Sequence, residues 1–386
     1  MTACFSSRAT RLQPFLAMEV MERAFEMERA GVRILHLEVG EPDFAPPPAA
    51  IEACVQALRR GETRYTDSRG LLELREAISA DYARRFDASV DPERVLVTSG
   101  TSAAMLLVFS LLVDNGDEVV MGTPHYPCYP NFIRACGGTP VFVAMDPARG
   151  YRLDPAAVRA ALTPRTRAVL VSSPANPTGA VQSRETLQEI ADLGVPVVSD
   201  EIYDGLVYDG ARVTSALRVS DDAYVLDGFS KRYAMTGFRL GWVVAPPPAL
   251  RLLQTLQQNL FISANHFVQR AGIAALRDGA ATVDAMRTAY EKRRILLAEG
   301  LRNLGFGVPS LPQGAFYVLA DARAYDGDSR RLAFELLERA HVGATPGIDF
   351  GEAAVGWLRF CCAVSESTIE EALRQLARAL PELAAR

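Results

Sequence analysis

The sequence predicts an α/β fold with a mostly parallel central sheet flanked by helices, followed by a smaller α+β part. The first observation is the alternation, from residue 94 to residue 226, of short apolar runs with stretches of helical periodicity, which is typical of parallel strands joined by helices. The second is the predominance of helical patterns after residue 248. The expected strands cover residues 95–97, 119–121, 141–143, 168–171, 195–198, 224–226, 316–320 and 356–360, and the expected helices include 10–31, 49–60, 102–113, 128–136, 183–193 and 280–303.

The length of the chain suggests two domains. With 386 residues, 49% of them hydrophobic, it can bury a large core. We expect a large domain over residues 45–275, which holds the alternating pattern, and a small domain made of both chain ends, residues 1–44 and 276–386. A Gly-Glu-Pro-Asp turn at 40–43 and three prolines at 46–48 break regular structure where the first segment enters the large domain.

The composition excludes several classes of protein. With a formal net charge of -5 and a pI near 5.6, the chain lacks the basic surface that nucleic acid or an anionic membrane would require. No uncharged segment has a membrane-spanning length, and the N-terminus lacks the pattern of a signal peptide. The six cysteines show no metal-binding spacing and the four histidines are isolated, so we expect reduced thiols, no metal site and a cytoplasmic location.

A phosphate site is predicted after the first expected strand of the sheet, because open α/β sheets bind ligands at the carboxyl ends of their strands. The segment Thr98–Ser102 enters a helix there, and the free N–H groups and the dipole of a helix N-terminus favour an anion. Gly100, Thr101 and Ser102 are therefore candidate phosphate-binding residues. An ordinary Ser/Thr cap on the helix is the alternative.

Two further candidates follow later strands. Asn176 lies in the proline-fixed turn Asn-Pro-Thr-Gly, which is either a binding group or only a favourable turn. Asp200 ends an apolar strand, and a buried carboxylate needs a partner, either in an internal salt bridge or in the protonated ring nitrogen of a ligand. Tyr203 follows closely, so its hydroxyl could reach the same ligand as Asn176.

Lys231 and Arg239 follow the apolar run 224–226. Arg239 lies between Gly237 and Gly241, whose lack of side chains lets the backbone approach a ligand. A guanidinium suits a phosphate dianion, and a partly desolvated amine suits a Schiff base with an aldehyde. Together the two residues suggest pyridoxal phosphate, whereas Lys231 alone would be interpreted as a solvated surface charge.

Arg359 lies within the short apolar run Trp357–Phe360. A guanidinium placed in this way either binds a carboxylate through two hydrogen bonds or forms an internal ion pair.

These motifs resemble those of the class I/II aminotransferases, the fold-type I pyridoxal-phosphate enzymes. Ser-Lys-x(5)-Gly-x-Arg-x-Gly at 230–241 is similar to the family's cofactor-lysine signature. Asn-Pro-Thr-Gly at 176–179 and Asp-Glu-x-Tyr at 200–203 are also family patterns. The resemblance extends in the right order from about Pro14 to Arg374.

The resemblance implies a role for each candidate. Lys231 holds the cofactor aldehyde as an imine and then carries the proton between the substrate Cα and the cofactor, while Asp200 keeps the ring nitrogen protonated. By the same resemblance, Asn176 and Tyr203 lie at the phenolic oxygen of the cofactor, Tyr126 lies on the face of its ring, and Tyr65 reaches the phosphate in the partner chain of a homodimer with shared sites. The residues implied around the cofactor and its phosphate are Gly100, Thr101, Ser102, Ser230 and Arg239. Those implied at the substrate are Gly40, Asn176 and Arg359.

Two positions depart from the family. Gly228 stands where many relatives have a serine or threonine hydroxyl on the phosphate, so one phosphate contact is in doubt. Cys361 stands where a serine is commoner.

The expected function is reversible transfer of an amino group between an L-amino acid and a 2-oxo acid. A β-lyase, decarboxylase or synthase on the same fold would use identical cofactor contacts and is the first alternative. A more remote one is a regulator that senses pyridoxal phosphate, which would need a DNA-binding segment ahead of the aminotransferase-like body. The choice among acidic, aromatic and aliphatic amino acids is left open.

Overall fold

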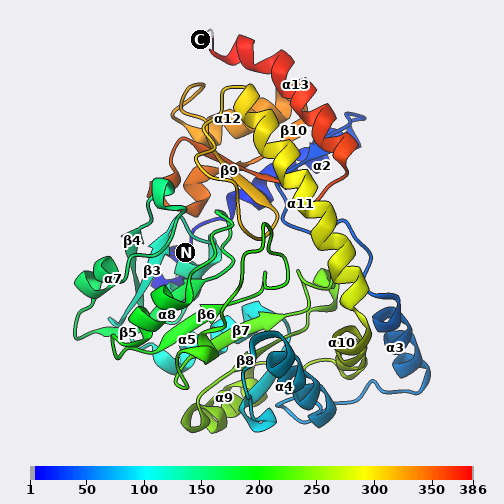
Figure 1. Cartoon of the computed structure of the whole chain (residues 1–386), viewed down its shortest axis with the longest axis vertical. Coiled ribbons are helices and arrows are strands. Elements are labelled where there is room, and N and C mark those ends of the chain that lie inside the picture. The colour runs from blue at the N-terminus through cyan, green and yellow to red at the C-terminus, as the bar shows by residue number, and fades with distance from the viewer. Residues whose placement is uncertain (1–4, 385–386) are drawn as a thin grey trace.

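The computed structural model describes residues 5–384 and holds a seven-stranded sheet at one end and a three-stranded sheet at the other (Figure 1). Residues 1–4, with Cys4, and residues 385–386 of the expected small domain lie outside the described residues. The strands are β1 Leu35–His36, β2 Val95–Thr98, β3 Glu118–Thr123, β4 Thr139–Ala144, β5 Thr166–Ser172, β6 Val197–Asp200, β7 Tyr224–Gly228, β8 Gly241–Val244, β9 Tyr317–Asp321, β10 Val342–Gly343, β11 Thr345–Pro346 and β12 Trp357–Cys361. The helices are α1 Ser7–Thr10, α2 Leu16–Arg29, α3 Pro48–Arg59, α4 Leu72–Phe86, α5 Thr101–Leu112, α6 Cys128–Ala135, α7 Pro155–Ala161, α8 Arg184–Ala191, α9 Pro247–Leu260, α10 His266–Asp278, α11 Ala280–Asn303, α12 Ser329–Glu335 and α13 Glu366–Ala384.

The large sheet is mostly parallel, as the sequence predicts. Its strand order is β2-β8-β7-β6-β5-β3-β4, and only β8 runs against its neighbours, pairing antiparallel with β2 and β7. β8 was not among the expected strands, because its four residues directly follow the glycine-rich motif of Arg239. Since the other strands run in one direction, the carboxyl ends of β2, β3, β5, β6 and β7 meet at one edge of the sheet.

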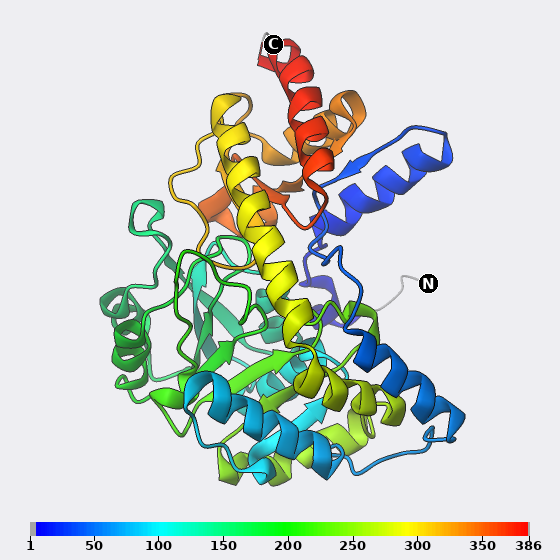
Figure 2. The same ribbon diagram turned by 45° about the vertical axis from the view of Figure 1, so that its right-hand side comes forward.

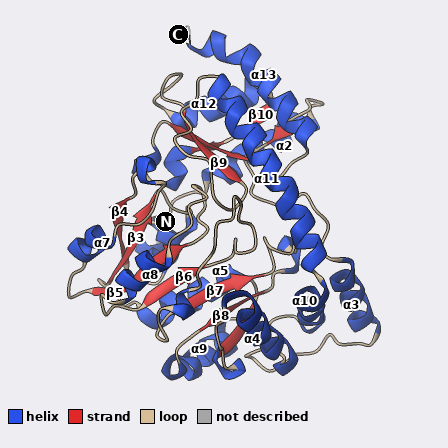
Figure 3. Ribbon diagram, viewed as in Figure 1, coloured by secondary structure: helices blue, strands red, loops and turns tan. Residues whose placement is uncertain are grey.

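Side chains of the large sheet alternate between two cores. In β2, Val95 and Val97 pack into one core and Leu96 into the other. In β5, Val169 belongs to the first core and Leu170 to the second. Helices cover both faces (Figure 3), which is the usual setting of a largely parallel sheet. The apolar runs of the sequence therefore form strands that are buried on both faces.

The segment that holds α2 and β1 meets the C-terminal segment in the part that holds the small sheet. This sheet has the antiparallel order β11-β12-β9, and β1 pairs in parallel with β10, which ties the N-terminal segment to the C-terminal part. The long helix α11 runs from the large-sheet part to the small-sheet part (Figures 1 and 2). The division into domains at residues 45 and 275 remains a prediction.

The expected first helix, over residues 10–31, is shorter in the structure. Residues before Leu16 are not part of α2, because Pro14 disfavours helical geometry at the residue before it. This leaves Phe15, Ala17 and Met18 at the start of α2, facing a cavity. In the described part of the chain, no helix combines the length and the apolar character that crossing a membrane requires.

Candidate active site

A cavity of about 260 Å³ lies at the carboxyl edge of the large sheet, where the two ends of the molecule meet. It brings together most of the predicted site residues, namely Gly40, Thr101, Ser102, Tyr126, Asn176, Asp200, Tyr203, Ser230, Lys231, Arg239 and Arg359. A larger cavity of about 640 Å³ lies between Gln13–Glu19 and residues 348–352 but contains none of the predicted residues. The smaller cavity is therefore the candidate active site.

Lys231 projects into this cavity from the loop after β7. Its Nζ donates a hydrogen bond to the carbonyl oxygen of Gly40 at 2.6 Å, and no carboxylate forms an ion pair with it among residues 5–384. Burial lowers the pKa of this amine to about 8. The surface-charge interpretation is thus excluded, because the amine is enclosed and a larger fraction of it is neutral near physiological pH than of an ordinary lysine.

Asp200 lines the same cavity at the end of β6. The hydroxyl of Tyr129 donates to Oδ2 at 2.6 Å, and the backbone N–H of Ile202 donates to Oδ1 at 3.2 Å. Burial raises the pKa of this carboxyl group. None of the described residues forms a salt bridge with it, so the internal salt bridge considered from the sequence is not observed.

The N-terminus of α5 forms a cradle for an anion. The helix begins after Gly100, which has a φ of 84°, and no side chain caps its first N–H groups. The guanidinium of Arg239 lies over Gly100, so that a Cβ there would be 2.7 Å from Nη2. A Cβ on Gly241 would likewise be 2.9 Å from the backbone nitrogen of Thr101. The alternative of an ordinary Ser/Thr cap on α5 is therefore not observed, because no described side chain binds the first N–H groups of this helix.

Arg359 is a buried guanidinium whose partners are all uncharged. Its Nη2 donates to the carbonyl oxygen of Glu38 at 2.5 Å and to Thr345 Oγ1 at 3.0 Å, and its Nη1 donates to Asn176 Oδ1 at 3.0 Å. The Nε group is buried without a hydrogen-bond partner. The guanidinium carbon lies 4.3 Å from the centre of the Tyr317 ring. No described carboxylate pairs with Arg359, so the internal ion pair is not observed and a donor is left for a ligand.

Comparisons with known proteins identify the family. The family description "Aminotransferase class I and II" matches residues 32–376. The chain is 36% identical to the (5-formylfuran-3-yl)methyl phosphate transaminase of Methanocaldococcus jannaschii, with 96% of this chain and 98% of the relative covered. It is 39% identical to the valine–pyruvate aminotransferase of Mycobacterium tuberculosis, with 95% and 96% covered. The solved structure of the aspartate aminotransferase from Thermus thermophilus with maleate matches with a TM-score of 0.94 at 39% identity, over 98% of this chain and 100% of that one.

The chain belongs to the class I and II aminotransferases. It is therefore an enzyme that transfers amino groups, and its fold is that of the fold-type I aminotransferases.

Two predicted residues of this aminotransferase do not line the cavity. Gly100 lies just beneath Arg239, as described above. Tyr65 is 80% exposed on the surface of the single chain. The role of Tyr65 at the phosphate of a partner chain therefore remains a prediction.

The structure gives a physical reason for one departure from the family pattern. A Cβ on Gly228 would lie 3.0 Å from the carbonyl oxygen of Leu240 and 3.1 Å from the Cα of Gly241. Both neighbours are backbone atoms of the adjacent strand segment, which cannot easily yield. A side chain at residue 228 would therefore be tightly packed against the backbone of the adjacent segment, and glycine avoids this crowding.

Several lining residues were missed from the sequence. Tyr317 shares a 2.7 Å hydrogen bond between its hydroxyl and that of Tyr203, and Tyr129 is the donor to Asp200. Glu38 is fully buried at the cavity wall. Nothing in the sequence distinguishes these residues from ordinary core tyrosines or a surface glutamate, because their roles depend on contacts between distant segments.

Proposed function

We propose that this aminotransferase binds pyridoxal 5'-phosphate in the 260 Å³ cavity and uses it to move an amino group between an L-amino acid and a 2-oxo acid. The observation that carries the proposal is that one cavity holds two groups, an amine and a carboxylate, that each lack a charged partner among the described residues. Lys231 is an enclosed amine without a carboxylate partner, and Asp200 is a buried carboxylate without a cationic partner. The cofactor has what each group lacks, an aldehyde for the amine and a ring N–H for the carboxylate.

The phosphate end of the cofactor fits the cradle at α5. Arg239 is exposed at the cavity mouth, and Thr101, Ser102 and Ser230 line the wall beside it. The uncapped N–H groups of the helix favour a dianion. Gly100 permits the close approach of Arg239, since any side chain there would displace the guanidinium.

The ring end of the cofactor fits the remaining wall. The Oδ1 atom of Asn176 is engaged by Arg359, which turns the amide nitrogen into the available donor for a phenolic oxygen. Tyr203, held by Tyr317, offers a second hydroxyl. Tyr126 lines the cavity and is the proposed stacking residue on the ring face.

The α-carboxylate of the substrate is assigned to Arg359, with Asn176 and Gly40 beside it. The unpartnered Nε of Arg359 is the donor that a carboxylate would take. The hydrogen bonds of Arg359 to Glu38 and Thr345 fix the orientation of its guanidinium, which favours recognition of a carboxylate through two hydrogen bonds.

When bound, pyridoxal phosphate supplies an electron sink for the Cα–H bond of the substrate. Lys231, in its neutral form, accepts the proton from Cα and later returns it. With a pKa of about 8, roughly a tenth of the amine is neutral at pH 7, whereas an unperturbed lysine would be almost entirely charged. Asp200 in its ionised form holds the proton on the ring nitrogen, and the hydroxyl of Tyr129 orients that carboxylate.

The half-reaction tests this function. An amino acid added alone should convert the cofactor to pyridoxamine phosphate with release of one equivalent of 2-oxo acid, and a second 2-oxo acid should restore the starting absorbance. Ammonia or a thiol released on every turnover, without the pyridoxamine form, would instead identify a lyase. A screen of amino acids against several 2-oxo acids would then define the substrates.

A homodimer with shared sites is part of the proposal, supported by the exposure of Tyr65 at the surface of the single chain. Mixing Tyr65→Phe chains with Lys231→Ala chains should give heterodimers with one intact site and restored activity. Sedimentation that finds only active monomers would end this idea. The cytoplasmic location also remains a prediction.

A further inference from the structure

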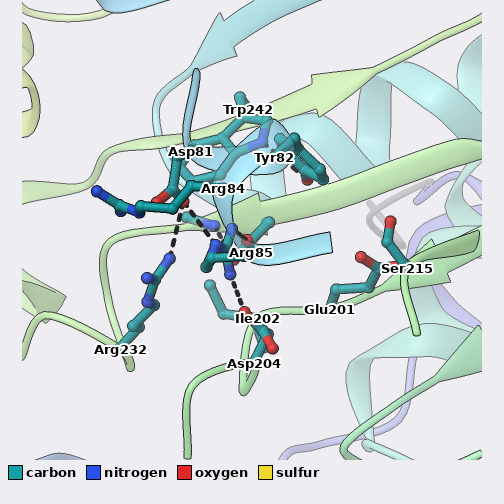
Figure 4. A network of polar contacts seen from close by, with 12 residues as sticks. Asp81, Tyr82, Arg84, Arg85, Glu201, Ile202, Asp204, Ser215, Arg232 and Trp242 are labelled. Atoms are coloured by element: carbon teal, nitrogen blue, oxygen red, sulfur yellow. Dashed lines mark hydrogen bonds and ion pairs between the residues drawn. The ribbon is translucent and has the colours of Figure 1, made fainter. Parts of the chain in front are cut away.

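A buried ion cluster joins α4 to the loops after β6 and β7 (Figure 4). It consists of Asp81 and Arg85 from α4, Asp204 from the loop after β6, Asp227 from the end of β7, and Arg232 from the loop after β7. None of the five side chains is more than 11% exposed, and none lines the cavity. The cluster is therefore separate from the groups that would touch cofactor or substrate.

Arg85 is the centre of the buried ion cluster. Its Nη1 donates to Asp204, and its Nη2 donates to Asp227 Oδ2 at 3.3 Å. Its Nε lies 2.7 Å from Asp81 Oδ2, and the same carboxylate oxygen accepts a hydrogen bond from Arg232 Nη1 at 2.9 Å. One guanidinium fork thus joins the loop after β6 to the end of β7, and Asp81 extends the connection to the loop after β7.

These loops carry the reactive groups of the proposed site. Asp204 directly follows Tyr203, and Arg232 directly follows Lys231. The two loops also pack closely, because a Cβ on Gly205 would lie 3.0 Å from Arg232 Nε. Two members of the buried ion cluster are thus chain neighbours of site residues, and their loops are in contact.

We propose that the buried ion cluster is a positioning device, in which Arg85 and Asp81 fix the segment that carries Asp200 and Tyr203 relative to the segment that carries Lys231. The inference rests on the proposed function, since it assigns the cluster to the placement of these groups around pyridoxal phosphate. Ion pairs are directional, and well-packed apolar side chains often stabilise a fold equally well. The charges of the cluster thus hold a geometry that an apolar core would leave less defined.

The cluster acts on the site through geometry and not through charge. The pKa of Lys231 is lowered by burial and influenced by Cys361, Glu41, Arg359 and Arg239, none of which belongs to the cluster. Removal of Arg85 should therefore leave the pKa of Lys231 in place. It should also leave Asp204 and Asp227 without their shared cation, so that both loops rearrange.

The test compares Arg85→Met with the matched control Arg75→Met. Arg75 is also buried on α4 and binds one carboxylate, Glu93, and the carbonyl oxygen of Pro92, which lie before β2 and outside both loops. At a temperature at which circular dichroism shows all proteins folded, Arg85→Met should lower kcat about 100-fold, the scale expected when reacting groups are misplaced by about 1 Å. It should change the KM for the amino acid by less than about threefold and alter the visible circular dichroism of the bound cofactor. Arg75→Met should lower the melting temperature and leave kcat and the cofactor signal near wild type.

Two further variants keep the test decisive. Arg85→Lys retains the charge without the fork and should rescue only part of kcat. If Arg85→Met does not fold, the isosteric Asp204→Asn removes one ion pair and should lower kcat about tenfold with the same change in cofactor dichroism. Wild-type kcat and cofactor dichroism in the folded Arg85 and Asp204 variants would overturn the inference. A wild-type enzyme that binds no pyridoxal phosphate would overturn the proposed function itself, and this inference with it.

Discussion

Two groups of cationic side chains lie close together in this molecule and differ in their partners. In the cavity, the hydrogen bonds that Lys231, Arg239 and Arg359 make to residues 5–384 all go to uncharged oxygens. In the buried ion cluster, Arg85 and Arg232 are paired with carboxylates. A cation without a counter-charge in an enclosed place is costly unless a ligand supplies one. The first group therefore points to anionic and electrophilic ligands, and the second to the geometry of the protein.

The largest expected effect follows from removing the reactive amine. Lys231→Ala should lower turnover at least about 10⁴-fold, because proton transfer at Cα loses its base, and it should shift the visible absorbance of the bound cofactor. The chain contains one other lysine, Lys292, which is exposed on α11. Lys292→Ala is the control and should behave as wild type in steady-state kinetics and absorbance. Equal loss in both variants would contradict the assignment.

Arg359→Lys tests the unpaired guanidinium in the core. An ammonium cannot replace the fork, so activity with amino acids should fall by about 2 to 5 kcal/mol of transition-state stabilisation, or roughly 30- to several-thousand-fold in kcat/KM. Simple amines, which lack the carboxylate, should be much less affected, and cofactor absorbance should persist. Equal damage to amines and amino acids would place Arg359 with the structural cations instead.

The pH dependence of cofactor attachment sharpens the comparison further. Only the neutral amine attacks an aldehyde, and burial lowers the pKa of Lys231 to about 8. Below pH 8, the rate at which pyridoxal phosphate attaches to cofactor-free protein should rise about tenfold per pH unit, and above pH 8 it should level off. Stopped-flow absorbance measures this rate. A rate that keeps rising up to pH 10 would be that of an ordinary lysine.

The smallest effect is expected at His36, a paired cation near the surface. Its imidazole lies 2.6 Å from Glu38 and 3.1 Å from Glu28, and the hydrogen bond to Glu38 raises its pKa to about 9. Because the folded pKa lies above the ordinary value near 6.5, protonated His36 stabilises the fold fully below pH 6.5, and this contribution disappears as the pH rises through 9. His36→Gln should cost about 1–2 kcal/mol of unfolding free energy at pH 6, after allowance for partial exposure, and much less at pH 9.5. Urea unfolding at the two pH values measures it, and an equal loss at both would contradict the pairing.

Much of the fold was predictable because its strands are buried on both faces. The apolar runs of β2, β5 and β6 stand out in the sequence, and polar residues such as Asn176 and Asp200 mark their carboxyl ends. The antiparallel strand β8 was not predictable in the same way, because its four residues merge with the motif of Arg239.

The limits at the site have a different cause. Lys231 and Arg232 are adjacent and both cationic, yet one faces a cavity and the other a carboxylate from α4. Only the packing of α4 against the loops after β6 and β7 separates the two roles. Tyr129 and Tyr317 were missed for the same reason, since each acquires its role from a partner more than 70 residues away.

The most direct test of the central claim is to locate the covalent attachment of the cofactor. The chain has only two lysines, so borohydride reduction of the loaded protein followed by peptide mass spectrometry gives a clear answer. One reduced pyridoxyl group per chain on Lys231, with none on Lys292, is the predicted result. A group on Lys292, or no modification of either lysine, would contradict the claim that the enclosed, unpaired amine is the reactive centre.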